Sequence, residues 1–238
     1  MDNLNIKLFA DGADIDGIKE MAGNPLIRGF TTNPTLMRNA GVSDYEQFAR
    51  DVLQVVTDAP VSFEVFADDW PTMEAQAKTI ASWGSNVNVK IPVSNTAGEP
   101  STDLIRRLSA DGVAVNVTAV FTLDQVGAIA AALDRDTPAI VSVFAGRIAD
   151  TGLDPIPLMR EAAALLNDLP KAELLWASPR ELLNVFHAEE AGCDIITATN
   201  DLLKKLTLIG KDLTDYSTET VQMFYRDASA AAYTIRTS

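Results

Sequence analysis

The most restrictive feature of this sequence is a regular alternation of short β-rich runs with amphipathic stretches along most of the chain. Eight runs rich in valine and isoleucine are predicted strands, at residues 6–11, 27–33, 61–67, 86–93, 113–121, 138–147, 172–178 and 194–200. Eight stretches with apolar residues at helical spacing are predicted helices, at residues 14–23, 44–56, 72–84, 101–112, 123–134, 156–169, 181–192 and 201–210. Eight consecutive βα units predict an α/β fold that closes as a (β/α)8 (TIM) barrel; an open doubly wound sheet is the alternative.

The length of the chain agrees with one barrel. It has 238 residues and 47% hydrophobic composition, which is enough to fill a large core. Neither a composition shift nor a long Pro/Ser-rich linker divides it, so residues 1–238 are predicted to form a single barrel domain. Residues 217–234 give one further helix, which we expect to pack on the barrel or on a neighbouring subunit of a homo-oligomer.

The charge of the chain limits its partners. A formal net charge of −14 argues against nucleic acid or an anionic membrane as the main partner, because both require a basic surface. A bound phosphate must therefore be held by locally placed arginines. The first residues lack a basic segment followed by an apolar core, and no apolar run is long enough to span a membrane. We expect a cytoplasmic protein.

Cysteine and histidine are nearly absent. One cysteine, Cys193, excludes an internal disulfide, and one histidine, His187, lies in a helical pattern with no nucleophile motif near it. Cys/His zinc sites, a Walker A sequence and a GxGxxG motif after a strand are all missing from the sequence. We therefore expect chemistry carried by Lys, Asp, Glu, Ser, Thr or Arg, with no metal and no cofactor.

Polar residues recur near the same end of the predicted strands. Catalytic groups of TIM barrels lie at the C-terminal ends of the strands, whereas inward-facing residues lower down fill the core. Seven of the eight predicted strands carry polar or charged residues there: Asp11, Thr32, Asn33, Glu64, Lys90, Asn116, Thr118, Ser142, Arg147, Ser178 and Arg180. These residues are the candidate site.

Lys90 interrupts a run, residues 86–93, that otherwise resembles a strand buried on both faces. Enclosure by apolar strands disfavours the charged form of an amine and makes it available as a neutral nucleophile. Such an amine forms a Schiff base with a ketone, and Asp11, Glu64 and Thr118 lie on nearby strands to move the protons. The alternative is a structural lysine that reaches solvent or forms a buried ion pair with Asp11 or Glu64.

Five segments together resemble the transaldolase family, including its short branch related to fructose-6-phosphate aldolase. They are GFTTNPTLM, VKIPV, NVTAVF, SVFAGRIAD and ASPR, and they occur in order through most of the chain. The resemblance implies a class I aldolase that transfers a dihydroxyacetone unit from a ketose phosphate to an aldose phosphate. Fructose 6-phosphate and sedoheptulose 7-phosphate are the expected donors, as in the pentose phosphate pathway.

The resemblance also implies roles for the site residues. Lys90 corresponds to the Schiff-base lysine and Asp11 to the proton-transfer aspartate. Glu64 and Thr118 correspond to the pair that positions the catalytic water. Hydroxyl and phosphate groups of the substrate are then held by the remaining positions: Asn33, Asn116 and Ser142 for hydroxyls, and Arg147, Ser178 and Arg180 for phosphate.

Two positions bear on the type of reaction. Glu64 and Phe144 resemble transaldolases proper, whereas the fructose-6-phosphate aldolases have Gln and Tyr at these positions. An apolar ring at position 144 cannot orient a water as a phenol can, so an enamine is expected to survive until an aldehyde arrives. The alternative for Phe144 is barrel packing.

Departures from the family pattern leave the substrate open. Gly12 stands where the family shows a hydroxyl residue, Pro179 removes a backbone donor from the expected phosphate site, and the loop at residues 94–101 is longer than in the short branch. A lyase of the fructose-6-phosphate aldolase type, or a transaldolase acting on a modified sugar, remains an alternative. A third alternative is a catalytically silent barrel that serves as a binding module.

Overall fold

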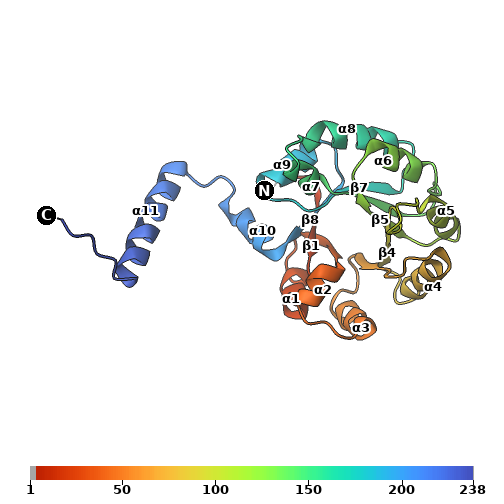
Figure 1. Ribbon diagram of the computed structural model, residues 1–238, viewed down its shortest axis with the longest axis horizontal. Coiled ribbons are helices and arrows are strands. Elements are labelled where there is room, and N and C mark those ends of the chain that lie inside the picture. Colours follow the sequence, from red (N-terminus) through yellow and green to blue (C-terminus); the bar gives the residue numbers. More distant parts are fainter. Residues whose placement is uncertain (1–3, 238) are drawn as a thin grey trace. The chain divides into compact units, whose positions relative to one another are not determined.

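Eight parallel strands form a closed barrel in the computed structural model, which describes residues 4–237 (Figure 1). The strands are β1 (Lys7–Asp11), β2 (Ile27–Thr31), β3 (Val61–Glu64), β4 (Val87–Pro92), β5 (Val115–Val120), β6 (Ala139–Val143), β7 (Ala172–Trp176) and β8 (Ile195–Thr199). The predicted TIM barrel is confirmed. The open sheet is wrong, because β1 pairs with β8 in continuous register from Lys7↔Ile195 to Asp11↔Thr199.

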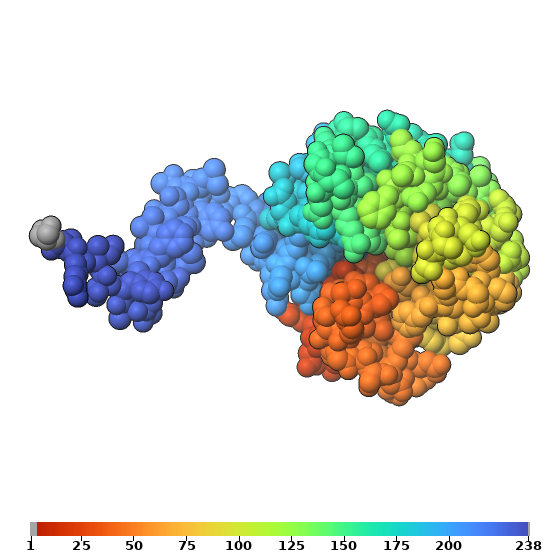
Figure 2. Space-filling view, in the orientation of Figure 1, coloured from red at the N-terminus to blue at the C-terminus, as the bar shows by residue number. Residues whose placement is uncertain are grey.

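Helices follow the strands around the outside of the barrel. They are α1 (Ile15–Ala22), α2 (Pro34–Asn39), α3 (Tyr45–Val55), α4 (Trp70–Ala81), α5 (Thr102–Ala110), α6 (Leu123–Ala130), α7 (Ala145–Asp150), α8 (Pro155–Leu166), α9 (Leu183–Glu190) and α10 (Asn200–Lys204). In the space-filling view, consecutive segments follow one another around the ring (Figure 2). None of the helices within residues 4–237 has the length and apolar character needed to span a membrane.

Two short helices differ from the sequence prediction. α2 follows the strand predicted at 27–33 and was not predicted, whereas the first three residues of α7 were predicted as the end of the strand at 138–147; each forms six residues of helix. Asn33 begins α2, since its side chain accepts a hydrogen bond from the N–H of Leu36 and Pro34 follows as the first helical residue. Six residues are too few for an apolar periodicity to appear. The predicted helix at 201–210 is in fact α10 followed by a 3₁₀ turn, Lys205–Leu208.

The chain divides into two compact units, the barrel up to Lys204 and a C-terminal segment from Lys205. The segment contains α11 (Leu213–Ala230). This helix starts and stops four residues earlier than the helix predicted at 217–234. Asp212 sets the start, because its carboxylate accepts hydrogen bonds from the N–H groups of Thr214 and Asp215.

Apolar side chains fill the barrel interior. Phe9, Ile140, Leu175, Ala177 and Ile195 form one buried cluster against which Phe144 packs. Gly29 on β2 makes room for this core, since a Cβ there would lie 2.4 Å from the ring of Phe9. The polar residues at the C-terminal ends of the strands therefore lie next to a packed apolar core.

Candidate active site

The C-terminal ends of the strands enclose a pocket of about 400 Å³. It is lined by most of the predicted site residues, namely Asp11, Asn33, Glu64, Lys90, Thr118, Ser142, Phe144, Arg147 and Ser178. The other three, Thr32, Asn116 and Arg180, do not line it. The barrel thus brings side chains from seven strands or their following loops into one cavity.

Lys90 lies on the wall of this pocket with only 8% of its side chain exposed. The strand register sets it directly opposite Glu64 on β3. Its Nζ is 3.0 Å from Glu64 Oε2 and donates to the carbonyl oxygen of Thr32 at 2.8 Å. The buried ion pair that the sequence left open as an alternative is therefore formed, and a carboxylate stands ready to accept a proton from the amine.

Thr32 contributes its backbone rather than its side chain. Its hydroxyl donates to the carbonyl of Ser62 at 3.0 Å and is buried between β2 and β3. Its carbonyl oxygen is the atom that contacts Lys90. The neighbouring residue Thr31 lines the pocket, and Thr32 does not, so Thr32 is not a side-chain contact for a substrate.

Asp11 is held by hydrogen bonds at both oxygens. Oδ1 accepts from the hydroxyl of Thr31 at 2.8 Å, and Oδ2 accepts from Asn33 Nδ2 at 3.3 Å. Burial raises the pKa of Asp11 above its ordinary value, although the charge of Lys90 and these two hydrogen bonds oppose the rise. A carboxyl group with a raised pKa is suited to accept a proton and return it.

Two pocket threonines were missed by the sequence prediction. Thr31 and Thr197 line the pocket, and their hydroxyl oxygens lie 2.6 Å apart. Thr197 brings in β8, the one strand to which no candidate was assigned. The signal was present, because Thr197 and Thr199 alternate with Ala198 at the end of IITAT and therefore lie on the same face of that strand.

Asn116 lies beneath the pocket and is fully buried. Its Oδ1 accepts from the hydroxyl of Ser142 at 2.6 Å, and its Nδ2 donates to Ser62 Oγ at 3.0 Å. Both ends of the amide are thereby used. Asn116 fixes the orientation of Ser142, which does line the pocket.

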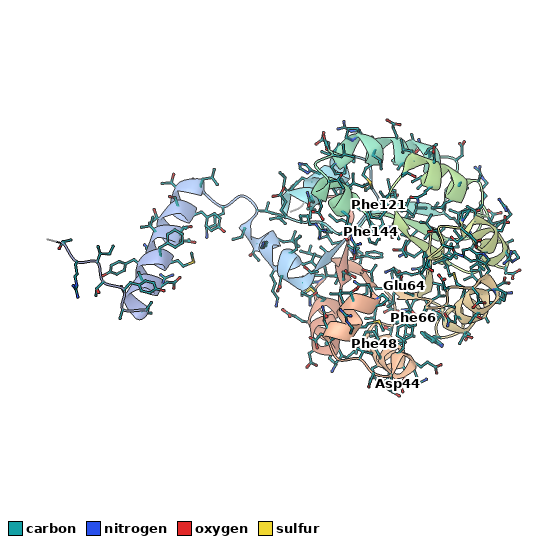
Figure 3. The ribbon with its side chains drawn as sticks, viewed as in Figure 1. Asp44, Phe48, Glu64, Phe66, Phe121 and Phe144 are labelled. Atoms are coloured by element: carbon teal, nitrogen blue, oxygen red, sulfur yellow. The ribbon has the colours of Figure 1, made fainter. Side chains whose placement is uncertain are left out.

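An aromatic wall stands beside these polar groups. The rings of Phe121 and Phe144 have centroids 5.7 Å apart, and Figure 3 shows the two side by side. The guanidinium of Arg147, on α7, lies 5.2 Å from the centroid of the Phe144 ring. Phe144 therefore contacts both the buried core cluster and the guanidinium of Arg147. It packs in the barrel and lines the pocket at the same time.

Two residues that line the pocket have unusual backbone geometry. Ala119 and Ser178 have positive φ angles of 59° and 57°, although neither is glycine, and both line the pocket. The carbonyl of Ser178 is pressed against Gly146 so closely that a Cβ at Gly146 would lie 1.6 Å from its oxygen. Sparsely populated backbone conformations of this kind cluster at functional sites.

Arg180 is directed to a partner outside the pocket. Its guanidinium makes a two-point contact with the carboxylate of Asp150, with Nε 3.0 Å from Oδ1 and Nη2 in contact with Oδ2. This hydrogen bonding lowers the pKa of Asp150 below its ordinary value. Of the two candidate phosphate arginines, Arg147 therefore lines the pocket and Arg180 is paired with an acid.

Residues 8–235 match the family model described as Transaldolase/Fructose-6-phosphate aldolase. The chain belongs to this family. Its members are class I aldolase enzymes, and the family implies sugar phosphates as substrates.

Curated relatives of this family member match 84% to 94% of its length. A "Probable transaldolase" of Clostridium acetobutylicum is 34% identical over 225 residues, which is 94% of this chain and 99% of the relative. A "Probable transaldolase" of Dehalococcoides mccartyi is 33% identical, covering 84% of this chain and 90% of the relative. A "Probable transaldolase" of Lactiplantibacillus plantarum is 36% identical, covering 84% and 88%.

Among solved structures, the barrel resembles one described as a "putative phosphonomutase" from Burkholderia cenocepacia. The TM-score is 0.56 with 14% sequence identity, and the match covers 93% of each chain. At this identity the likeness concerns the fold alone.

The remaining reactive side chains lie apart from the site of this aldolase-family barrel. Burial raises the pKa of the Cys193 thiol to about 12, so this sulfur stays protonated at neutral pH. Within residues 4–237, His, Cys, Asp and Glu side chains form no group of three or more that could hold a metal ion.

Proposed function

We propose that this protein is a transaldolase that carries a dihydroxyacetone unit on Lys90 from a ketose phosphate to an aldose phosphate. The observation that supports it best is the arrangement of Lys90, Glu64 and Asp11 in one pocket at the C-terminal end of the barrel. The amine and its neighbouring acids match what Schiff-base chemistry requires, a nucleophile with groups that take and return protons.

Schiff-base formation begins at the ion pair. The ammonium of Lys90 gives a proton to Glu64, and its lone pair attacks the C2 carbonyl of the ketose. A second proton moves from the attached nitrogen through a water held near Thr118 to the C2 oxygen, which gives the carbinolamine. The proton held by Glu64 then passes to the carbinolamine hydroxyl, which leaves as water. The product is an iminium between Nζ and C2.

Carbon–carbon cleavage then depends on Asp11. The carboxylate of Asp11 takes the proton of the C4 hydroxyl. The C3–C4 bond then breaks, and the electron pair of this bond moves to the iminium to give an enamine. The aldose phosphate formed from C4 onward departs. An acceptor aldehyde is attacked by C3 of the enamine, Asp11 returns its proton to the new hydroxyl, and water releases the product ketose from Lys90.

Substrate groups are assigned to the remaining pocket residues. Asn33 and Ser142 are placed to contact hydroxyls, with Asn116 acting through Ser142. Arg147 and Ser178, which both line the pocket, are the proposed phosphate contacts. Arg180 joins them only if a phosphate competes with Asp150 for its guanidinium.

Borohydride reduction followed by intact-mass spectrometry tests the proposal. With fructose 6-phosphate as donor, we expect a three-carbon adduct on Lys90 because the aldose half is released before reduction. The panel includes sedoheptulose 7-phosphate, unphosphorylated fructose and ketoses modified at the distal end, so that it also identifies the donor. A chain that forms no adduct with any ketose is a binding module in which the Lys90–Glu64 ion pair stays closed.

Phe144→Tyr tests the choice between transferase and lyase. A phenol in place of the Phe144 ring can orient a water toward the enamine, so protonation and release of free dihydroxyacetone should increase by about tenfold. The measurement is dihydroxyacetone formed from fructose 6-phosphate without an acceptor. If the wild-type protein already releases it at the rate of full turnover, the lyase alternative is correct.

We also propose a homo-oligomer located in the cytoplasm, with α11 packed on the barrel or on a neighbouring subunit. None of the described side chains of α11 is buried, and several are large and apolar, including Val221, Met223, Phe224 and Tyr225. An eighteen-residue helix with such side chains is stabilised by packing against another surface.

A further inference from the structure

We propose that Tyr45 is a positioning residue that holds Glu64 against Lys90 from outside the barrel, an inference that rests on the proposed role of Glu64. The hydroxyl oxygen of Tyr45 accepts a hydrogen bond from the backbone N–H of Glu64 at 2.8 Å. The same hydroxyl donates to the backbone carbonyl of Glu64 at 3.0 Å. One side chain of α3 thus satisfies both backbone groups of a pocket residue.

The contact replaces a strand partner that β3 lacks. β2 and β3 pair only through Phe30↔Val61 and Thr31↔Ser62. The carbonyls of Pro60 and Ser62 accept hydrogen bonds from the N–H groups of Phe30 and Thr32, and the next backbone groups on that side belong to Glu64. The chain of β2 has by then turned into α2, so Tyr45 supplies the donor and the acceptor that a longer strand would have supplied.

The opposite side of Glu64 is held by β4. Glu64 is in register with Lys90, and the N–H of Val65 donates to the carbonyl of Lys90 at 3.2 Å. The end of β3 is therefore fixed between the strand that carries the nucleophile and the hydroxyl of Tyr45. Without the hydroxyl, only one side remains anchored.

Tyr45 is itself rigidly placed. It is the first residue of α3, whose start is fixed by Asp44, which accepts from the N–H of Gln47 at 2.9 Å. Its ring contacts three other aromatic rings, with centroid distances of 6.2 Å to Phe63, 4.6 Å to Phe66 and 5.6 Å to Trp83. In Figure 3, Phe66 lies between Glu64 and two residues at the start of α3, its N-cap Asp44 and Phe48.

The double contact requires a neutral phenol. Burial raises the pKa of Tyr45, so the hydroxyl keeps its proton across the pH range in which proteins stay folded. A phenol can donate to a carbonyl and accept from an N–H at once, whereas a phenolate has no proton to donate. The contact is therefore independent of pH where the enzyme works.

A second cavity explains why Glu64 needs this support. About 330 Å³ of space lies behind the site, lined by Tyr45, Phe66, Trp83 and Glu64 among others. Among residues 4–237, Glu64 alone lines both this cavity and the catalytic pocket. If the end of β3 loosens, its carboxylate has room to leave the amine of Lys90.

Tyr45→Phe tests the proposal because it removes the hydroxyl and keeps the ring. We expect kcat to fall by about tenfold while KM changes by less than about twofold, since Glu64 acts on proton transfer and not on substrate binding. In a double-mutant cycle, Tyr45→Phe should have almost no further effect on kcat in a Glu64→Gln background. Thr79→Val is the matched control, because it removes a hydroxyl at the same second cavity that bonds only to Ala75 on its own helix.

Hydrogen exchange of the Glu64 amide supplies a readout that does not depend on activity. Tyr45→Phe should speed exchange of this amide by about tenfold, and Thr79→Val should leave it unchanged. Unchanged exchange at Glu64, or kinetic effects of Tyr45→Phe and Glu64→Gln that multiply, would overturn the proposal. Failure of the wild-type protein to form a borohydride adduct refutes the proposed function instead, and the exchange comparison still decides whether Tyr45 holds Glu64.

Discussion

Lys90→Met will abolish adduct formation with every ketose and lower turnover by roughly 10⁴-fold or more, because the covalent step has no other nucleophile. Methionine fills nearly the same volume as the lysine stem, so the barrel should keep its fold. The measurements are borohydride trapping and a coupled turnover assay. Lys19→Met is the control, since Lys19 is an exposed helical lysine whose ammonium reaches Asp16 only.

The same variant should be less stable than the wild type. Removing Lys90 leaves Glu64 without its cation in a site where only 17% of the Glu64 side chain is exposed, which costs roughly 2–4 kcal/mol. The double variant with Glu64→Gln should recover most of this loss, because no charge is then left unpaired. Urea denaturation of the three proteins measures the differences. Turnover or an adduct in Lys90→Met would contradict the role of the lysine.

The architecture could be predicted because each βα unit has its own local sequence pattern, a short β-rich run followed by an amphipathic stretch. Residues 86–93 combine apolar composition with one lysine, and this pattern alone indicates both a buried strand and an unusual group within it. The barrel rule then gathers residues far apart in sequence at one rim. Asp11 and Ser178 could be placed in the same pocket for this reason, although 167 positions separate them.

The partners of these residues could not be read in the same way. Asp150 and Arg180 follow different strands of the barrel, β6 and β7, and no local pattern indicates that their side chains meet. The choice between Thr31 and Thr32 depends on a single residue of strand register, which decides which hydroxyl faces the pocket. Tyr45 was not predicted as part of the site because it lies on the outside of the barrel and acts on the backbone of Glu64.

Asp11→Asn separates Schiff-base formation from carbon–carbon cleavage. Asparagine can still accept the hydrogen bond of Thr31 but cannot take a proton from a substrate hydroxyl, so kcat should fall by about 10³-fold. Lys90 and Glu64 remain, and borohydride should still trap a sugar on the lysine. With fructose 6-phosphate the trapped species should be the intact six-carbon ketose in place of the three-carbon fragment. A three-carbon adduct formed at the wild-type rate would assign cleavage to another acid.

The pH dependence of stability checks the environment that makes Asp11 suitable. Because its pKa is raised in the folded protein, the folded state binds this proton more tightly than the unfolded chain does. The contribution of Asp11 to the free energy of unfolding should therefore fall as the pH rises from 3.8, the ordinary value, through the raised pKa of Asp11. Asp11→Asn lacks this titrating carboxyl group, so the free energy of unfolding of the variant relative to the wild type should increase across that pH interval. Parallel stability profiles for the two proteins would mean that the pocket does not favour the protonated acid, and proton return by Asp11 would lose its physical basis.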